Sequence, residues 1–75
     1  MKTKYKFIEF IQHPSVSTVW ICQNKRSHDY LGCAEVYAPW KAHVFRSDIN
    51  SVFSADCLRD IAHFLSQLNG GTHEG

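Results

Sequence analysis

Apolar and polar positions alternate through the first two-thirds of the chain, which is the pattern of half-buried β-strands. The alternation predicts strands at residues 4–11, 17–23, 33–37 and 40–46. Pro14 indicates a turn after the first strand, and Pro39 a tight turn between the last two, because proline lacks an amide donor and fixes its own φ. The last two strands are therefore expected to form a hairpin.

After residue 53 the apolar period lengthens from two residues to that of an α-helix. The apolar stripe consists of Leu58, Ile61, Leu65 and Leu68, flanked by Cys57, Ala62 and Phe64. Ser54 stands where a helix N-cap belongs, and the run from Asn69 to Gly71 is a strong stop signal. The sequence therefore predicts one helix at the C-terminal end.

Together these elements predict an α+β fold, a four-stranded antiparallel β-meander followed by one C-terminal helix. Residues 1–69 are expected to form a single domain and residues 70–75 a flexible tail. Gly32, at the start of the third strand, predicts a bulge or a close approach of another segment.

The predicted sheet carries more large apolar side chains than one helix can cover. A helix of about 15 residues spans roughly 22 Å and lies on one face only. The alternation, however, sets Trp20 against Ile21, and Trp40 against Phe45, on opposite faces. An uncovered apolar face indicates an interface or a ligand groove, unless sheet twist, loops and the N-terminal arm cover it. Because a domain of 75 residues is marginally stable alone, we expect a homodimer or a larger self-assembly.

Composition narrows the function classes. A net charge of +1 gives no strong attraction to nucleic acid or anionic lipid. No apolar run reaches the ~18 residues that span a membrane, and the basic N-terminus is not followed by the apolar run of a signal peptide. Three widely spaced cysteines, Cys22, Cys33 and Cys57, are an odd number and predict reduced thiols in a cytoplasm.

Neither a metal site nor a catalytic group is expected. Cys22, His28 and Cys33 have a Cys-x5-His-x4-Cys spacing, which lacks the tight knuckle that aims two ligands at one zinc ion. His28 and Asp29 are adjacent, so their side chains do not converge, and no glycine-rich phosphate loop or nucleophile elbow occurs. The sequence predicts a non-enzymatic protein, without metal or cofactor, that works by binding.

Candidate binding residues fall mainly in the hairpin and in the loop before it. Hairpin residues of two subunits would together offer cations for phosphate and aromatic faces for a base, and the loop offers a second cationic surface. The candidates are Trp40, Lys41, His43, Phe45 and Arg46 in the hairpin, Trp20 in the second strand, and Lys25 and Arg26 in the loop. Alternatively, Lys2, Lys4 and Lys6 alternate along the first strand and, with the aromatics, indicate a platform for single-stranded nucleic acid.

The run Trp20…Leu31-Gly32…Trp40, followed by Phe53-Ser54-x-x-Cys57-Leu58-x-x-Ile61-Ala62-x-Phe64, resembles a family of small uncharacterised proteins of tailed phages and prophages. The similarity covers residues 20–69 and is most specific in the helical part; where the family pattern has arginine and tyrosine, this chain has Lys41 and His43. The resemblance implies a phage origin and a location in the cytoplasm of an infected bacterium, and it supplies no activity. By analogy with other small accessory phage proteins, we expect a counter-defence factor that blocks a host immune protein or sequesters a nucleotide immune signal. The alternative is an accessory protein that binds single-stranded nucleic acid.

Overall fold

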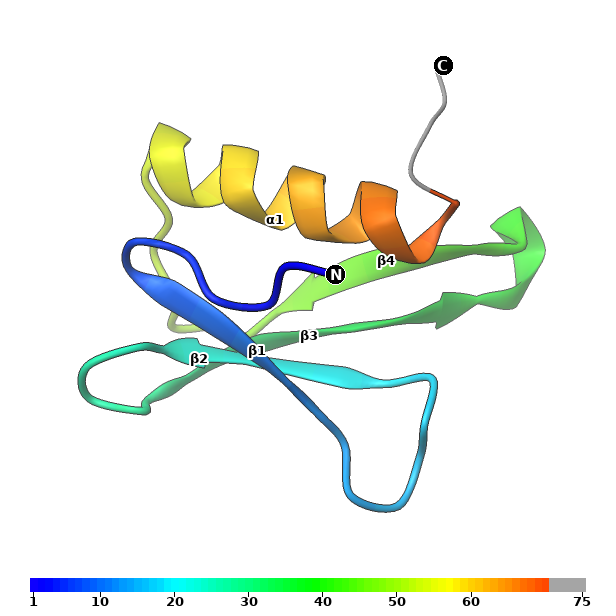
Figure 1. Cartoon of the computed structure of the whole chain (residues 1–75), viewed down its shortest axis with the longest axis horizontal. Coiled ribbons are helices and arrows are strands. Elements are labelled where there is room, and N and C mark those ends of the chain that lie inside the picture. The colour runs from blue at the N-terminus through cyan, green and yellow to red at the C-terminus, as the bar shows by residue number, and fades with distance from the viewer. Residues whose placement is uncertain (71–75) are drawn as a thin grey trace.

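The computed structural model describes residues 1–70, which form one antiparallel sheet with a helix packed on one face (Figure 1). The elements are β1 (Ile8–Gln12), β2 (Trp20–Asn24), β3 (Tyr30–Tyr37), the 3₁₀ turn η1 (Ala38–Trp40), β4 (Ala42–Ser47) and α1 (Ala55–Leu68). The strands lie side by side in the order β1-β2-β3-β4, so the predicted meander with a C-terminal helix is confirmed. Of the predicted tail, only Gly70 falls within the described residues. Within residues 1–70, no helix has the length and apolar character needed to cross a membrane.

The first strand is shorter than predicted because the chain folds back on itself before it. β1 begins at Ile8, and the preceding residues pair with it: Lys4 forms a bridge with Glu9, and the Phe10 amide donates to the Thr3 carbonyl at 2.8 Å. Residues 6 and 7 are the tip of this tight turn. The fold-back places the ring of Tyr5 in the core, next to Phe10, which a continuous strand from residue 4 would not do.

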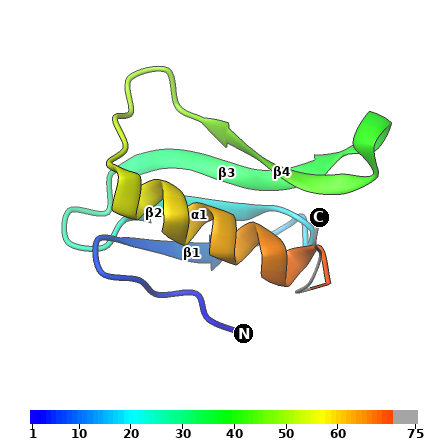
Figure 2. The ribbon, with the colours of Figure 1, turned by 90° about the horizontal axis from the view of Figure 1, so that it is seen from above.

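Side-chain hydrogen bonds fasten this N-terminal segment to α1. Tyr5 Oη lies 2.8 Å from His63 Nδ1, and Gln67 exchanges two hydrogen bonds with the backbone of Lys2, at 2.7 and 2.8 Å. Figure 2 shows the segment running along the outer side of β1, beside the helix. The segment therefore closes one edge of the sheet.

The predicted bulge lies between β2 and β3. The register shifts there, so that Cys22 pairs with Gly32 while Gln23 pairs with Tyr30. Gly32 has φ +154°, and a Cβ on it would stand 2.5 Å from the Arg46 carbonyl oxygen and 2.7 Å from the Phe45 ring. The position therefore requires glycine, both for its backbone angle and for the close approach of β4.

The last two strands form the predicted hairpin, with a different boundary. Trp40 lies in η1 and not in a strand, and Lys41, which follows it, has the left-handed backbone angle φ 52°. β4 then pairs with β3 from Ala42 onward. At the outer edge of β4, the side chain of Asn69 makes two hydrogen bonds with the backbone of His43. The His43 backbone amide donates to Asn69 Oδ1 at 2.8 Å, and Asn69 Nδ2 donates to the His43 carbonyl at 3.2 Å.

The helix begins as predicted, with the Cys57 amide donating to Ser54 Oγ at 3.2 Å. Phe64 is fully buried at the centre of the core, where its ring stacks on Phe10 with 3.8 Å between centroids and meets Trp20 edge-on at 5.4 Å. Leu58, assigned to the apolar stripe from its spacing, is 53% exposed. That assignment is wrong because the buried stripe is centred on Phe64 and Ile61, which leaves Leu58 at its margin.

Candidate binding surfaces

One face of the sheet is not covered by α1, and it is less aromatic than the sequence suggests. The strand pairings put Phe10, Trp20 and Phe45 on the helix face, aligned with the buried Cys22 and Ala34. By the same register the opposite face carries Glu9, Ile11, Ile21, Gln23, Tyr30, Cys33, Glu35, Tyr37, Val44 and Arg46. The expectation of bulky rings on both faces is therefore wrong for the middle of the sheet, whose uncovered face mixes aliphatic and polar side chains, while Tyr30 and Tyr37 lie at the two ends of β3.

Polar groups on the uncovered face are paired with one another. Gln23 Nε2 donates to Glu9 Oε2 at 2.7 Å, and the guanidinium of Arg46 forms an ion pair with Glu35. Glu35 also accepts a weak hydrogen bond from the Cys33 thiol, with Sγ 3.8 Å from Oε1. These pairs hold the charged groups in place and leave no row of free charge across the middle of this face.

An aromatic and cationic cluster, formed by Tyr37, Trp40 and Arg46, lies at the η1 end of the sheet. Trp40 is 72% exposed, and its ring meets that of Tyr37 edge-on with 5.0 Å between centroids. Arg46 Cζ lies 5.6 Å from the Tyr37 centroid, within cation–π range. A hollow of about 270 Å³ opens beside them, bordered also by Val44 and Phe45. We call this surface the Trp40 cluster.

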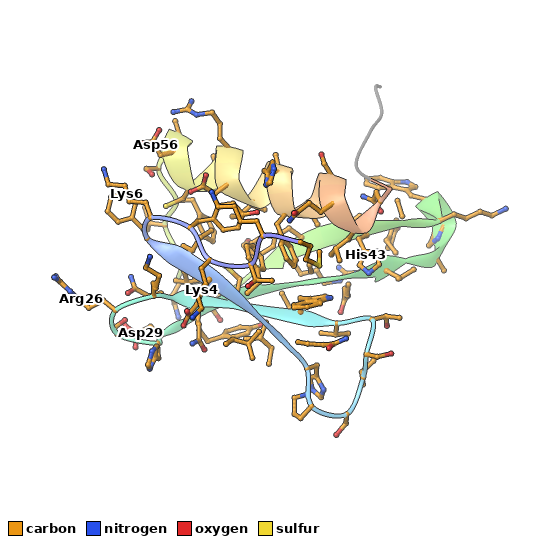
Figure 3. All side chains as sticks on the ribbon, in the orientation of Figure 1. Lys4, Lys6, Arg26, Asp29, His43 and Asp56 are labelled. Atoms are coloured by element: carbon orange, nitrogen blue, oxygen red, sulfur yellow. The ribbon has the colours of Figure 1, made fainter. Side chains whose placement is uncertain are left out.

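The other hairpin candidates do not join the Trp40 cluster. His43 Nε2 lies 3.0 Å from the Thr18 carbonyl oxygen, and Figure 3 shows His43 below the C-terminal end of α1. Phe45 borders the hollow, but its ring packs against Phe53 at 5.7 Å. Lys41 is next to Trp40 in the chain and does not line the hollow, and the ring of Trp20 packs on Phe64 in the core. The nucleotide site predicted from all five hairpin residues is therefore not assembled as one site within a single chain.

Lys25 and Arg26 lie at the other end of the molecule, in a second hollow that we call the Phe7 cleft. This cleft has a volume of about 470 Å³ and is lined by Lys6, Phe7, Asn24, Lys25 and Arg26. Figure 3 shows Lys6 and Arg26 projecting at the same end of the fold. Sequence reasoning missed Phe7 as a site residue and grouped Lys6 with Lys2 and Lys4, because it placed these residues along a regular strand.

The predicted row of lysines along the first strand does not form. The turn at Lys6 and Phe7 separates Lys6 from the two earlier lysines, and Figure 3 shows Lys4 and Lys6 at separate places on this segment. Lys2 Nζ lies 4.8 Å above the ring of Tyr5. The prediction of three lysines on one strand face is wrong because no strand runs through these residues.

Two buried titratable groups, the hydroxyl of Tyr5 and the thiol of Cys22, have raised pKa values and keep their protons at neutral pH. Burial, with a smaller contribution from Asp60, raises the pKa of Tyr5 to about 12, so its hydroxyl is an uncharged partner for His63. Burial raises the pKa of the Cys22 thiol to about 12, with a smaller contribution from the nearby Cys57. A thiol in this state is a poor nucleophile. Within residues 1–70, His, Cys, Asp and Glu side chains form no group of three placed to hold a metal ion.

The fold and these two surfaces define a small α+β protein with solvent-open hollows at opposite ends of its sheet. No protein-family model, no curated protein and no solved structure matches the chain.

Proposed function

We propose that this chain is a non-enzymatic binding protein that contacts a protein partner through the Trp40 cluster, and that the first such partner is a second copy of the chain. The observation that carries the proposal is a tryptophan that is 72% exposed in a domain with few large side chains in its core. Tryptophan, tyrosine and arginine are the residue types most enriched at the energetic centres of protein interfaces. These three types are present here, with the ring of Tyr37 in contact with both Trp40 and Arg46.

The cluster is also held in place before any partner arrives. Arg46 is fixed by its ion pair with Glu35 and by the Tyr37 ring, and Trp40 leans on the same ring. Ordering a long side chain on binding costs about 0.5–1.5 kcal/mol. Because that ordering is already present in the free chain, more of the contact energy is available for association.

In the phage setting that the sequence resemblance implies, we propose that the assembled protein works in the cytoplasm of an infected bacterium as a counter-defence factor that occupies a host immune protein. What supports this narrower proposal is the resemblance in residues 20–69, together with a preformed contact surface. Capture of a nucleotide signal by the hairpin receives less support, because His43 and Phe45 are engaged away from Trp40.

The test is the mass of the protein in solution over a range of concentrations, measured by light scattering and sedimentation. We expect a dimer or larger species that Trp40→Ala shifts to the monomer, while Lys41→Ala, the matched neighbour outside the hollow, does not. Tryptophan emission should move to shorter wavelength on association, because Trp40 passes from water into an interface. A monomer at every concentration, with unchanged emission, would refute self-association through this cluster.

A further inference from the structure

The Phe7 cleft is built from two segments that the backbone ties together. The turn at Lys6 and Phe7 and the β2–β3 loop meet where the Lys25 amide donates to the Phe7 carbonyl at 2.9 Å. The hollow between them, about 470 Å³, lies in the range of small-molecule sites, which is about 300–1,000 Å³. The β2–β3 loop and the turn before β1 lie at the opposite end of the sheet from η1 (Figure 1), so the Phe7 cleft and the Trp40 cluster are separate surfaces with no lining residue in common.

Three cations surround this cleft without carboxylate partners. Among residues 1–70, ion pairs join Arg46 to Glu35, Arg59 to Asp56 and His28 to Glu9, and none involves the cations that line the cleft, Lys6, Lys25 and Arg26. The carboxylates at this end do not line the cleft either. Three exposed cations around one hollow that has no carboxylate in its lining favour an anionic ligand.

An exposed aromatic ring completes the site. Phe7 is 47% exposed, and Lys6 Nζ lies 5.2 Å from its ring centroid. A ring beside phosphate-binding cations is what a nucleotide requires, because any base can stack on an aromatic face while its phosphates bind the cations.

The loop that presents Lys25 and Arg26 is closed by its own hydrogen bonds. Asn24 Oδ1 accepts from the backbone amides of Arg26 and Ser27, both at 2.9 Å, and the Asn24 amide donates to the Asp29 carbonyl at 2.9 Å. The backbone of the two cationic residues is therefore positioned before a ligand binds, which lowers the ordering cost of binding.

We propose that the Phe7 cleft binds a nucleoside polyphosphate, with its base against Phe7 and its phosphates bound by Lys6, Lys25 and Arg26. A long nucleic-acid strand is the less favoured ligand, because strand binding uses a cationic groove that tracks several nucleotides. Here the cations are gathered at one cleft in a chain of net charge +1. The proposal does not depend on self-association, since its residues and those of the Trp40 cluster do not overlap.

In the test, the full chain is titrated separately with ATP, with inorganic pyrophosphate and with a short oligothymidylate. Calorimetry measures the affinity of each ligand, and amide chemical shifts show which residues it contacts. We expect ATP to shift amides of residues 6–7 and 24–26. The double change Lys25→Gln with Arg26→Gln should weaken ATP and pyrophosphate at least about tenfold. Phe7→Ala should weaken ATP at least about fivefold and leave pyrophosphate unchanged. Phe7→Leu, which keeps an apolar side chain, serves as a second variant with the same expected direction.

Lys41→Gln is the matched control, because it removes one positive charge at the opposite end and should leave ATP affinity unchanged. Three results would each overturn the proposal: no ATP binding at millimolar concentration, ATP-dependent shifts centred on Trp40, or an equal loss of ATP affinity in Lys41→Gln. Tighter binding of oligothymidylate than of ATP, with a steep fall as salt rises, would overturn it in favour of single-stranded nucleic acid.

Discussion

Replacing Gly32 with alanine tests the description of how β3 and β4 meet. The new Cβ would stand 2.5 Å from the Arg46 carbonyl oxygen and 2.7 Å from the Phe45 ring, and the backbone would keep a φ of +154°. A backbone carbonyl in a paired strand cannot move aside as the end of a flexible side chain can. Gly32→Ala must therefore either separate the two strands or strain their ladder.

The expected loss of stability has two parts. Holding a non-glycine residue in a sparsely populated backbone region costs about 1–3 kcal/mol, and forcing an extra methyl into a packed site costs about 1–3 kcal/mol more. The sum, about 2–6 kcal/mol, is a large part of the roughly 4–11 kcal/mol expected for a domain of 75 residues. We expect a loss of 2 kcal/mol to lower the melting temperature by about 8–16 °C.

Urea unfolding followed by tryptophan fluorescence measures this loss, because Trp20 packs on Phe64 only in the folded chain. Gly70→Ala is the matched control: Gly70 also has a positive φ, +103°, but no atom of the described residues 1–70 lies within 4 Å of the added Cβ. It should cost about 1–2 kcal/mol from the backbone alone. If Gly32→Ala is no more destabilising than Gly70→Ala, the close approach of β4 to Gly32 is wrong.

Two further predictions concern the core. Phe64→Ala removes the fully buried ring that stacks on Phe10, and it should lower the free energy of unfolding in urea by about 3–5 kcal/mol. Leu58→Ala, at a side chain that is 53% exposed, should change stability by less than about 1 kcal/mol. Equal effects of the two changes would contradict the orientation of the helix. Stability should fall at alkaline pH, because the folded chain keeps the protons of Tyr5 and Cys22 up to a pKa of about 12 while the unfolded chain releases them near 10 and 9. Tyr5→Phe should make the fall between pH 10 and 12 less steep by the contribution of one proton, while the contribution of Cys22 remains, in a pH series of urea unfolding curves. An unchanged slope there would refute the assignment to Tyr5.

Local signals in the sequence were sufficient to predict the type and order of the strands and the helix. The alternation of side chains, the N-cap at Ser54 and the glycine at position 32 each report a short-range requirement of the backbone, and each has its expected counterpart in the structure. The start of β1 could not be predicted in this way. Its turn depends on Tyr5 reaching His63, 58 residues further along the chain, and no pattern within one strand carries that contact.

The candidate site was predictable by residue type more than by geometry. Trp40, Arg46, Lys25 and Arg26 were singled out as binding residues, and the structure puts them beside two separate hollows. Alternation assigned Trp40 to a strand face, but the 3₁₀ turn and the left-handed Lys41 interrupt the period of two between β3 and β4. The contribution of Phe7 became visible only once the turn before β1 was known.

The amide of Asn69 at the edge of β4 has a consequence for how copies of this protein can meet. Fibrils grow when the outermost strand of a sheet offers unused amide and carbonyl groups to the next molecule. In this fold the Asn69 side chain occupies both such groups of His43. The residues before β1 occupy the amide of Phe10 and the carbonyl of Ile8. Strand-to-strand polymerisation is therefore obstructed at these positions on the two margins of the sheet, which favours contacts between side chains if copies of the chain meet.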